Sequence, residues 1–366
     1  MKKIGLVVNP IAGMGGSVGL KGTDGNIVND AIELGAKPIT PERIQTVLRN
    51  IKRKEEIIFI VAPGVMGENY INEQEYNFKV IGEIGEITTA EDTKRIAKKM
   101  LEKEVDLIIF CGGDGTARDL YDAIDLKIPV IGVPAGVKMF SSVFALNPYT
   151  AAEIVDLFID GVAIQEQEVL DINEDSFRND ILDSKLYGYL KVPKLEKYLQ
   201  DAKKGSVKSK TSQNIKENIA LFIIENMERN SIYFLGPGTT VKAITDKLGL
   251  KKTLLGIDAI YNSQLIGTDL NEKQILQLIE KYDKSIIIVS PIGGQGFIFG
   301  RGNKQFTPKV IKKVGRENII IIATEDKIKG LKSLKVDTGD LKIDNLLKGY
   351  FKVIIDSNEK LLIEIE

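Results

Sequence analysis

The chain has 366 residues, of which 43% are apolar and 28% charged, a composition typical of about two or three globular domains. Its 50 Lys and Arg residues nearly cancel its 51 Asp and Glu residues, so no broad cationic surface for nucleic acid is expected. The absence of His and the single Cys exclude His-assisted nucleophiles, His-ligated metals, an internal disulfide and a thiolate metal cluster. Chemistry must therefore come from carboxylates, Lys, Arg, hydroxyls, backbone amides or a bound cofactor.

The first residues resemble the start of a secretory signal, but Asn9 and Pro10 interrupt the apolar run that follows Lys2 and Lys3. No apolar run approaches the roughly 18 residues that a membrane helix needs. We therefore expect a cytoplasmic protein with neither a membrane nor a nucleic acid as partner. A homo-oligomer is left open.

One local pattern recurs, an apolar β-branched run that ends in a glycine-bearing loop. Continuous apolar runs are typical of strands that are covered on both faces, as in parallel sheets. The runs and the loops after them are Ile4–Val8 with Asn9–Gly16, Ile57–Val61 with Ala62–Gly64, Leu107–Phe110 with Cys111–Thr116, Val130–Val133 with Pro134–Gly136, Ile232–Leu235 with Gly236–Thr240, and Ile286–Val289 with Ser290–Gly296. Because open α/β sheets bind ligands at the carboxyl ends of strands, six such loops favour binding over simple turns.

Segments with helical periodicity lie between these runs. Thr89–Lys103 opens with Thr-x-x-Asp, a variant of the capping box. The other predicted helices are Ala151–Ile159, Asn214–Met227, Val241–Leu248 and Glu272–Ile279. Two apolar runs near the end, Tyr350–Ile355 and Leu361–Ile365, predict a β-hairpin.

The alternation of strands and helices predicts two α/β domains with the active site in a cleft between them. Residues 1–170 form the expected nucleotide-binding domain, with a Rossmann-like sheet, and residues 219–366 the substrate domain. Residues 171–218 are interpreted as a connection with helices of its own. Its lysines are more typical of a solvated loop than of a phosphate site; they are Lys203, Lys204, Lys208 and Lys210.

The strongest motif is Gly112-Gly113-Asp114-Gly115-Thr116. Its glycines let the backbone approach a polyphosphate, and a helix that begins near Thr116 would direct its positive end at the anion. Asp114 would repel a phosphate, which makes sense if it binds the attacking hydroxyl or Mg²⁺ carried by a nucleotide. A Walker loop and a Gly-x-Gly-x-x-Gly dinucleotide fingerprint are absent, which argues against a simple NAD-dependent dehydrogenase.

With Asn9-Pro10-x-x-Gly13 near the N-terminus, this motif resembles the superfamily of NAD kinases, diacylglycerol kinases and sphingosine kinases. More narrowly, the chain is similar to the ATP–NAD kinase branch that includes the acetoin-catabolism AcoX proteins. The matching blocks are Asn9–Gly25, Gly112–Asp119, Pro134–Met139, Leu186–Val192, Leu235–Thr240, Thr253–Asp258, Pro291–Asn303, Gly315–Thr324 and Val336–Asp340.

The resemblance implies phosphoryl transfer from ATP, or from polyphosphate, to a hydroxyl group. For NAD as acceptor, the hydroxyl is the adenosine ribose 2′-OH and the product is NADP. Asp114 matches the catalytic or hydroxyl-orienting Asp of the family. The phosphate loop would be Gly112, Gly113, Gly115 and Thr116, and the nucleotide-side motif Asn9 and Gly13.

The chain departs from the pattern of these families in three places, one relative to the AcoX-like branch and two relative to the better-known NAD kinases. Asn173-Glu174 has the residue types of their substrate-gripping pair, but it lies in the setting of a strand exit. The C-terminal half alternates strands and helices, where those enzymes have a β-sandwich. Phe140 stands where the AcoX-like branch often has His, which removes a donor or proton carrier unless the position is structural.

The second half offers further candidates that would face the first site. The substrate-side loops contain Gly238, Thr239, Thr240, Gly294, Gln295 and Arg301. Arg301 could bind a phosphate with two parallel hydrogen bonds or form a surface ion pair. Asp258 and Asp337 could hold Mg²⁺ through water, and Lys138 could neutralise a phosphate or lie in solvent.

Three functions stay open. The first is an NAD kinase that uses ATP and Mg²⁺. The second is a kinase of another hydroxyl compound, such as a diol, a polyol or a lipid-like alcohol. The third is a non-catalytic nucleotide-binding regulator that keeps the loop.

Overall fold

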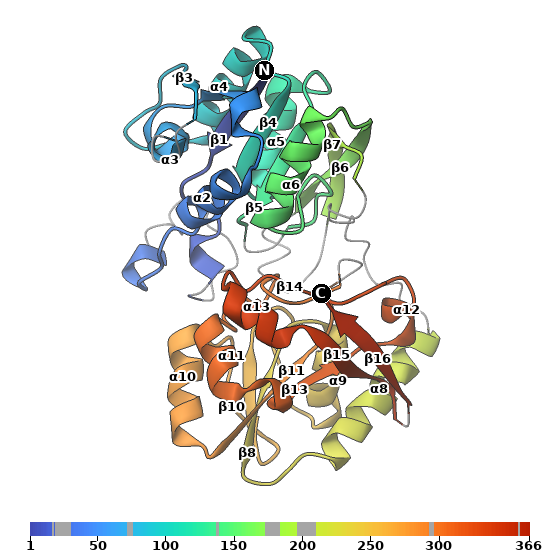
Figure 1. The fold of residues 1–366 in the computed structure, drawn as a ribbon. Coiled ribbons are helices and arrows are strands. Elements are labelled where there is room, and N and C mark those ends of the chain that lie inside the picture. The colour runs from blue at the N-terminus through green and yellow to red at the C-terminus, as the bar shows by residue number, and fades with distance from the viewer. Residues whose placement is uncertain are drawn as a thin grey trace. The chain divides into compact units, whose positions relative to one another are not determined.

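The structure, a computed structural model, describes residues 1–16, 18, 31–71, 76–136, 139–172, 184–195, 210–292, 296–357 and 359–366. The described residues form two compact units (Figure 1). The first is built from residues up to 195 and the second from residue 210 onward, with residues 15, 16 and 18 grouped with the second. Each unit combines a sheet with helices, which confirms the predicted α/β class.

Seven strands and five α-helices of the first unit lie wholly within its described residues. Its strands are β1 Lys2–Val8, β2 Ile57–Val61, β3 Phe78–Val80, β4 Leu107–Gly112, β5 Val130–Pro134, β6 Ile164–Ile172 and β7 Ser184–Pro193. Its helices are α2 Thr40–Asn50, α3 Glu68–Ile71, α4 Ala90–Glu102, α5 Asp114–Ile124 and α6 Pro148–Ile159. Short 3₁₀ helices lie at Lys54–Glu56 and Gly64–Met66, and another at Met14–Gly16.

Five strands of this unit form a parallel sheet in the order β3-β2-β1-β4-β5. Helices α2 and α6 pack together on one face, and α4 and α5 pack together on the other (Figure 1). The four strands predicted here by their apolar runs are buried on both faces, apart from a few half-buried positions. The carboxyl ends of β1, β4 and β5 therefore carry three neighbouring glycine loops.

The predicted start of α4 is confirmed. Thr89 is its N-cap residue, and the Asp92 carboxylate accepts the Thr89 N–H at 2.8 Å, which closes the capping box.

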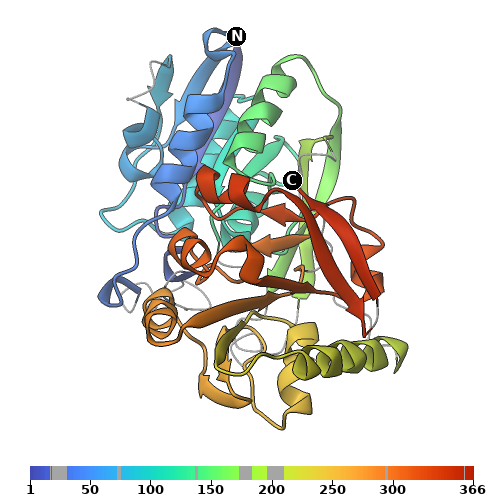
Figure 2. The same cartoon turned by 60° about the horizontal axis from the view of Figure 1, so that its bottom comes forward.

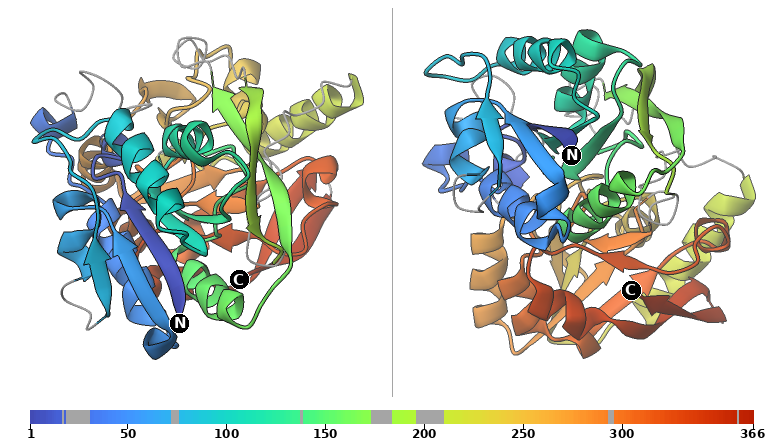
Figure 3. Two further views of the ribbon diagram at one scale, coloured as in Figure 1. Left: turned by 90° about the horizontal axis from the view of Figure 1, so that it is seen from above. Right: turned by 45° about the horizontal axis from the view of Figure 1, so that its top comes forward.

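Strands β6 and β7 form a separate antiparallel ribbon beside the sheet (Figure 3). Part of the expected connection is therefore a strand of the first unit. One face of the ribbon is buried, with Val169, Leu190 and Val192 in the core of that unit. Gly188 lies so close to α5 that an added Cβ would be 2.4 Å from the ring of Tyr121.

The second unit contains nine strands and six α-helices among its described residues. Its strands are β8 Ser231–Leu235, β9 Asp258–Tyr261, β10 Gln264–Gly267, β11 Lys284–Val289, β12 Phe297–Phe299, β13 Ile319–Ile322, β14 Lys335–Val336, β15 Gly349–Asp356 and β16 Glu359–Ile365. Its helices are α8 Lys210–Glu225, α9 Thr239–Lys247, α10 Glu272–Lys281, α11 Pro308–Val314, α12 Glu325–Ile328 and α13 Leu341–Leu347, with a 3₁₀ helix at Arg316–Asn318.

Seven of these strands form one mixed sheet in the order β10-β9-β8-β11-β13-β15-β16. Alternate residues of β8 enter different cores: Ile232 and Phe234 pack with α10, α11 and α13, whereas Tyr233 and Leu235 pack with α8 and α9. Burial on both faces explains why this strand reads as a continuous apolar run. The predicted C-terminal hairpin is confirmed as the antiparallel pair β15 and β16 (Figure 2).

Candidate active site

The glycine loop joins β4 to α5 and leaves little room for side chains. A Cβ atom on Gly112 would lie 2.4 Å from the Thr116 hydroxyl oxygen, and one on Gly113 would lie 3.2 Å from the Cα of Gly136. A side chain at Gly112 would therefore displace Thr116, and one at Gly113 would be tightly packed against Gly136. Gly115 is more open, since the nearest atom to its added Cβ would be 3.7 Å away. Gly113, the N-cap of α5, supplies no side-chain cap, so the first-turn amides keep their capacity to bind an anion.

The N-terminal motif contacts this loop directly. The Asn9 side-chain amide donates to the Thr116 hydroxyl oxygen at 3.1 Å, and its carbonyl oxygen accepts the Ile11 N–H at 3.2 Å. The Asn9 N–H donates to the Cys111 carbonyl at 2.9 Å. Because the Thr116 oxygen accepts in this contact, its hydroxyl proton can be donated to another acceptor, such as a phosphate oxygen.

A second backbone contact joins the loops after β1 and β5. Gly13 has a φ of +74°, and an added Cβ would lie 1.7 Å from the Ala135 carbonyl oxygen. The Arg43 guanidinium on α2 donates to the Pro134 carbonyl at 2.8 Å. The structure thus brings together three of the four glycine loops predicted in the first unit, those after β1, β4 and β5.

Asp114 is the first residue of α5 and is 8% exposed. One carboxylate oxygen accepts the Phe140 N–H at 2.8 Å, and the other accepts the Ser141 N–H at 3.0 Å. Burial, the largest effect, raises the pKa of Asp114, while the Ser141 hydroxyl, the two amides and the charge of Arg118 act to lower it. Since a carboxylate has about four acceptor positions, these two amide donors leave acceptor capacity for a substrate hydroxyl.

Of the two residues that hydrogen-bond to Asp114, Phe140 was discussed in the sequence analysis and Ser141 was not. The Phe140 side chain is fully buried and its backbone N–H holds Asp114, so the position expected to lack a proton carrier is a structural one. Ser141 was not predicted as a site residue. The one signal available was its place just after the matching block Pro134–Met139. No local sequence signal indicates Arg43, whose role depends on the packing of α2.

In the second unit, the loop after β8 begins α9. Gly238 is the N-cap with a φ of +110°, and its N–H donates to the Leu254 carbonyl at 2.8 Å. The Lys216 ammonium of α8 donates to the Thr239 hydroxyl at 3.1 Å, and Lys216 was also not predicted. The buried Thr240 hydroxyl has no hydrogen-bond partner among the described residues. This helix start therefore combines hydroxyl groups with a cationic side chain.

Arg301 and Asp337 form a buried ion pair, with 3.1 Å between Nη2 and Oδ2 and side-chain exposures of 3% and 5%. The guanidinium also lies 4.9 Å from the centre of the Phe297 ring. Arg301 is thus an ion-pair residue, but a buried one. Through this ion pair, the Arg301 guanidinium is the positively charged partner of the Asp337 carboxylate.

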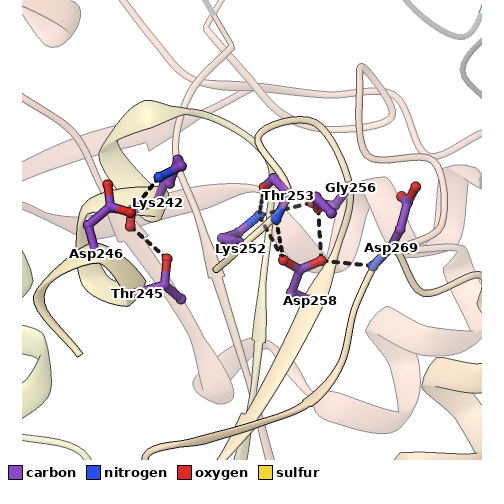
Figure 4. A network of polar contacts seen from close by, with 8 residues as sticks. All are labelled: Lys242, Thr245, Asp246, Lys252, Thr253, Gly256, Asp258 and Asp269. Atoms are coloured by element: carbon purple, nitrogen blue, oxygen red, sulfur yellow. Dashed lines mark hydrogen bonds and ion pairs between the residues drawn. The ribbon is translucent and has the colours of Figure 1, made fainter. Parts of the chain in front are cut away.

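Asp258 lies in a dense polar network at the start of β9 (Figure 4). Its oxygens accept the Thr253 N–H at 2.7 Å, the Thr253 hydroxyl at 2.8 Å and the Asp269 N–H at 2.8 Å. The Lys252 ammonium lies 4.0 Å from the carboxylate and donates to the carbonyls of Thr253 and Gly256 at 2.7 and 3.1 Å. Both charged side chains are fully buried, so the network fixes the loop that receives the Gly238 N–H.

Both proposed magnesium ligands therefore have protein partners instead. Across the described part of the chain, no three His, Cys, Asp or Glu side chains are grouped as a metal site. We assign no metal to Asp258 or Asp337. Lys138, Gly294 and Gln295 lie outside the described residues, as does Asn173-Glu174.

Comparison with known families identifies both halves of the chain. Residues 4–163 match the ATP-NAD kinase N-terminal domain, and residues 229–365 match the ATP-NAD kinase C-terminal domain. The chain belongs to the ATP-NAD kinase family. The two matches include the glycine loop of the first unit and the α9 loop of the second, but not Lys216 or strand β7.

Solved structures similar to this family member include a candidate diacylglycerol kinase from Bacillus anthracis str. Sterne, with 16% identity, a TM-score of 0.25, and 47% of this chain and 46% of that one covered. A second such structure and one of a diacylglycerol kinase, from the same organism, are 17% identical with TM-scores of 0.23, and 44% and 46% of their chains are covered. The chain thus spans about half the length of these proteins. No curated protein matches it.

Among the described helices, none is both long and apolar enough to cross a membrane.

Proposed function

We propose that this ATP-NAD kinase family member transfers a phosphoryl group from ATP to the adenosine ribose 2′-OH of NAD, giving NADP. The observation that carries the proposal is Asp114, a buried carboxylate held by neutral donors at the start of a helix whose first-turn amides have no side-chain cap. Family membership supports the phosphoryl transfer; the choice of NAD as acceptor rests on the family's description.

Each part of the loop has a chemical task in this proposal. The first-turn amides of α5 and the Thr116 hydroxyl bind phosphate oxygens. Asp114 accepts the proton of the attacking hydroxyl. The hydroxyl oxygen forms the new bond to the γ-phosphorus of ATP while the bond from that phosphorus to the leaving ADP breaks. We propose that Mg²⁺ arrives bound to the nucleotide phosphates, since proteins usually hold this ion through substrate phosphates and only one or two carboxylates.

The second unit would bind the acceptor. The α9 start, with Gly238, Thr239 and Lys216, offers hydroxyl and cationic groups suited to the diphosphate of NAD. Catalysis in such a kinase comes mainly from positioning and charge neutralisation.

The test incubates the protein with Mg-ATP, or with polyphosphate, and a panel of NAD, NADH, polyols and diacylglycerol. Products are identified by mass spectrometry, with Asp114→Asn as the control. NADP that forms with the wild type and not with the control supports the proposal. A different phosphate ester would show that another hydroxyl compound, and not NAD, is the acceptor. Ligand-stabilised melting with no product would indicate a nucleotide-binding regulator.

A further inference from the structure

The segment Phe140–Ser142 lies between the start of α5 and strand β6. On one side its amides donate to both oxygens of Asp114. On the other side the Ser141 hydroxyl oxygen accepts the Leu170 N–H at 3.0 Å, and the Ser142 N–H donates to the Glu168 carbonyl at 2.9 Å. The segment therefore links the carboxylate to the β6–β7 ribbon.

Within this segment, Ser141 is the residue that hydrogen-bonds to both ends of the link. Its hydroxyl oxygen accepts the Leu170 N–H at 3.0 Å, and its backbone N–H donates to the Asp114 carboxylate at 3.0 Å. The side chain is fully buried, so water cannot replace either contact. Without the hydroxyl, Ser141 would keep its N–H contact with Asp114 and lose its hydrogen bond to strand β6.

The ribbon itself is fixed to α5 further along the helix. The Tyr187 hydroxyl donates to Asp122 at 2.9 Å, and the Tyr187 and Tyr121 rings meet edge to face at 5.6 Å. Asp114 and Asp122 lie on the same helix, so α5 is joined to the ribbon through Ser141 at its start and directly through Asp122 near its end. This fixes the position of Leu170 relative to the carboxylate.

We propose that Ser141 is a positioning residue, which locks the Asp114 carboxylate against the β6–β7 ribbon and leaves its free acceptor position for the reacting hydroxyl. This inference rests on the proposed function of Asp114 as the proton acceptor. The charged group that acts on Asp114 is Arg118, one turn along the same helix, and the donors from Phe140 and Ser141 are neutral.

The neighbouring serine supplies a matched control. Ser142 is 1% exposed, and its hydroxyl has no hydrogen-bond partner among the described residues. Ser141→Ala and Ser142→Ala thus each remove one buried hydroxyl from adjacent positions. We expect Ser141→Ala to lower kcat about 10- to 100-fold with little change in KM, and Ser142→Ala to leave both unchanged.

The pH profile separates positioning from loss of stability. The Ser141 hydroxyl lowers the pKa of Asp114, so its removal should move the acid limb of kcat to higher pH. A purely structural defect would lower the active fraction at every pH and leave this limb in place. Ser141→Cys, which keeps the size and a weak donor, should fall between wild type and Ser141→Ala.

The outcomes distinguish this inference from the proposed function. If Asp114→Asn retains wild-type turnover, Asp114 is not the proton acceptor and the proposed function is at fault. If Asp114→Asn is inactive but Ser141→Ala matches Ser142→Ala in kcat and pH profile, the positioning role is refuted. If Ser141→Ala does not fold, wild-type kcat and pH profile in Ser141→Cys would refute it equally.

Discussion

Asp114 in the first unit and Asp258 in the second are both buried carboxylates at the end of a loop, but their partners differ. Asp114 accepts from the neutral amides of Phe140 and Ser141, whereas Asp258 has the Lys252 ammonium 4.0 Å away in addition to its neutral donors. A paired cation neutralises a buried charge and favours a structural role. A carboxylate held by neutral amides keeps free acceptor capacity, which suits proton transfer.

The largest expected effect is on turnover. Asp114→Asn removes the proton acceptor and should lower kcat about 10²- to 10⁴-fold, since that is the usual contribution of a general base. The asparagine NH₂ group would face either the Phe140 or the Ser141 N–H, so we expect a lower melting temperature with the fold retained. Steady-state kinetics and circular dichroism measure the two effects. Wild-type turnover would contradict the contrast between the two carboxylates.

The same contrast predicts a pH dependence. Because burial raises the pKa of Asp114, the acid limb of kcat should lie above the pH at which an exposed carboxylate titrates. As the pH falls through this raised pKa, the carboxylate is protonated and can no longer accept the proton. A kcat profile with its acid limb at the pH of an exposed Asp would contradict this assignment.

The sequence predicted β1, β2, β4, β5, β8 and β11 because each is largely buried on two faces and reads as an apolar run. It did not predict β7, since a ribbon with one buried face alternates and the register shift near Val169 and Leu170 breaks that alternation. The glycine loop and Asp114 follow from local motifs. The pairing of Arg301 with Asp337 and of Ser141 with Leu170 does not, because it depends on chain segments that meet only after folding.

In the second unit, substitution of the buried pair Lys252 and Asp258 should lower stability. Lys252→Met leaves the Asp258 charge buried without its cation and removes a donor from the carbonyls of Thr253 and Gly256. We expect the free energy of unfolding to fall by about 3–5 kcal/mol. The control is Lys242→Met, which breaks the partly exposed pair with Asp246 (Figure 4) and should cost about 0.5 kcal/mol or less. Equal losses in urea unfolding of the two variants would show that the buried pair is not structural.

The smallest expected effect compares two left-handed glycines, Gly13 in the first unit and Gly249 in the second. Their φ angles are +74° and +70°, so alanine should cost about 1–2 kcal/mol of backbone energy at either position. Around Gly249 an added Cβ meets nothing within 4 Å, whereas at Gly13 it would lie 1.7 Å from the Ala135 carbonyl oxygen. Gly13→Ala should therefore cost a further 1–3 kcal/mol, about the usual penalty of overpacking, and should raise the KM for ATP because it separates the loops after β1 and β5. Urea unfolding of both variants measures the difference. Equal losses would show that the first region does not depend on this backbone contact.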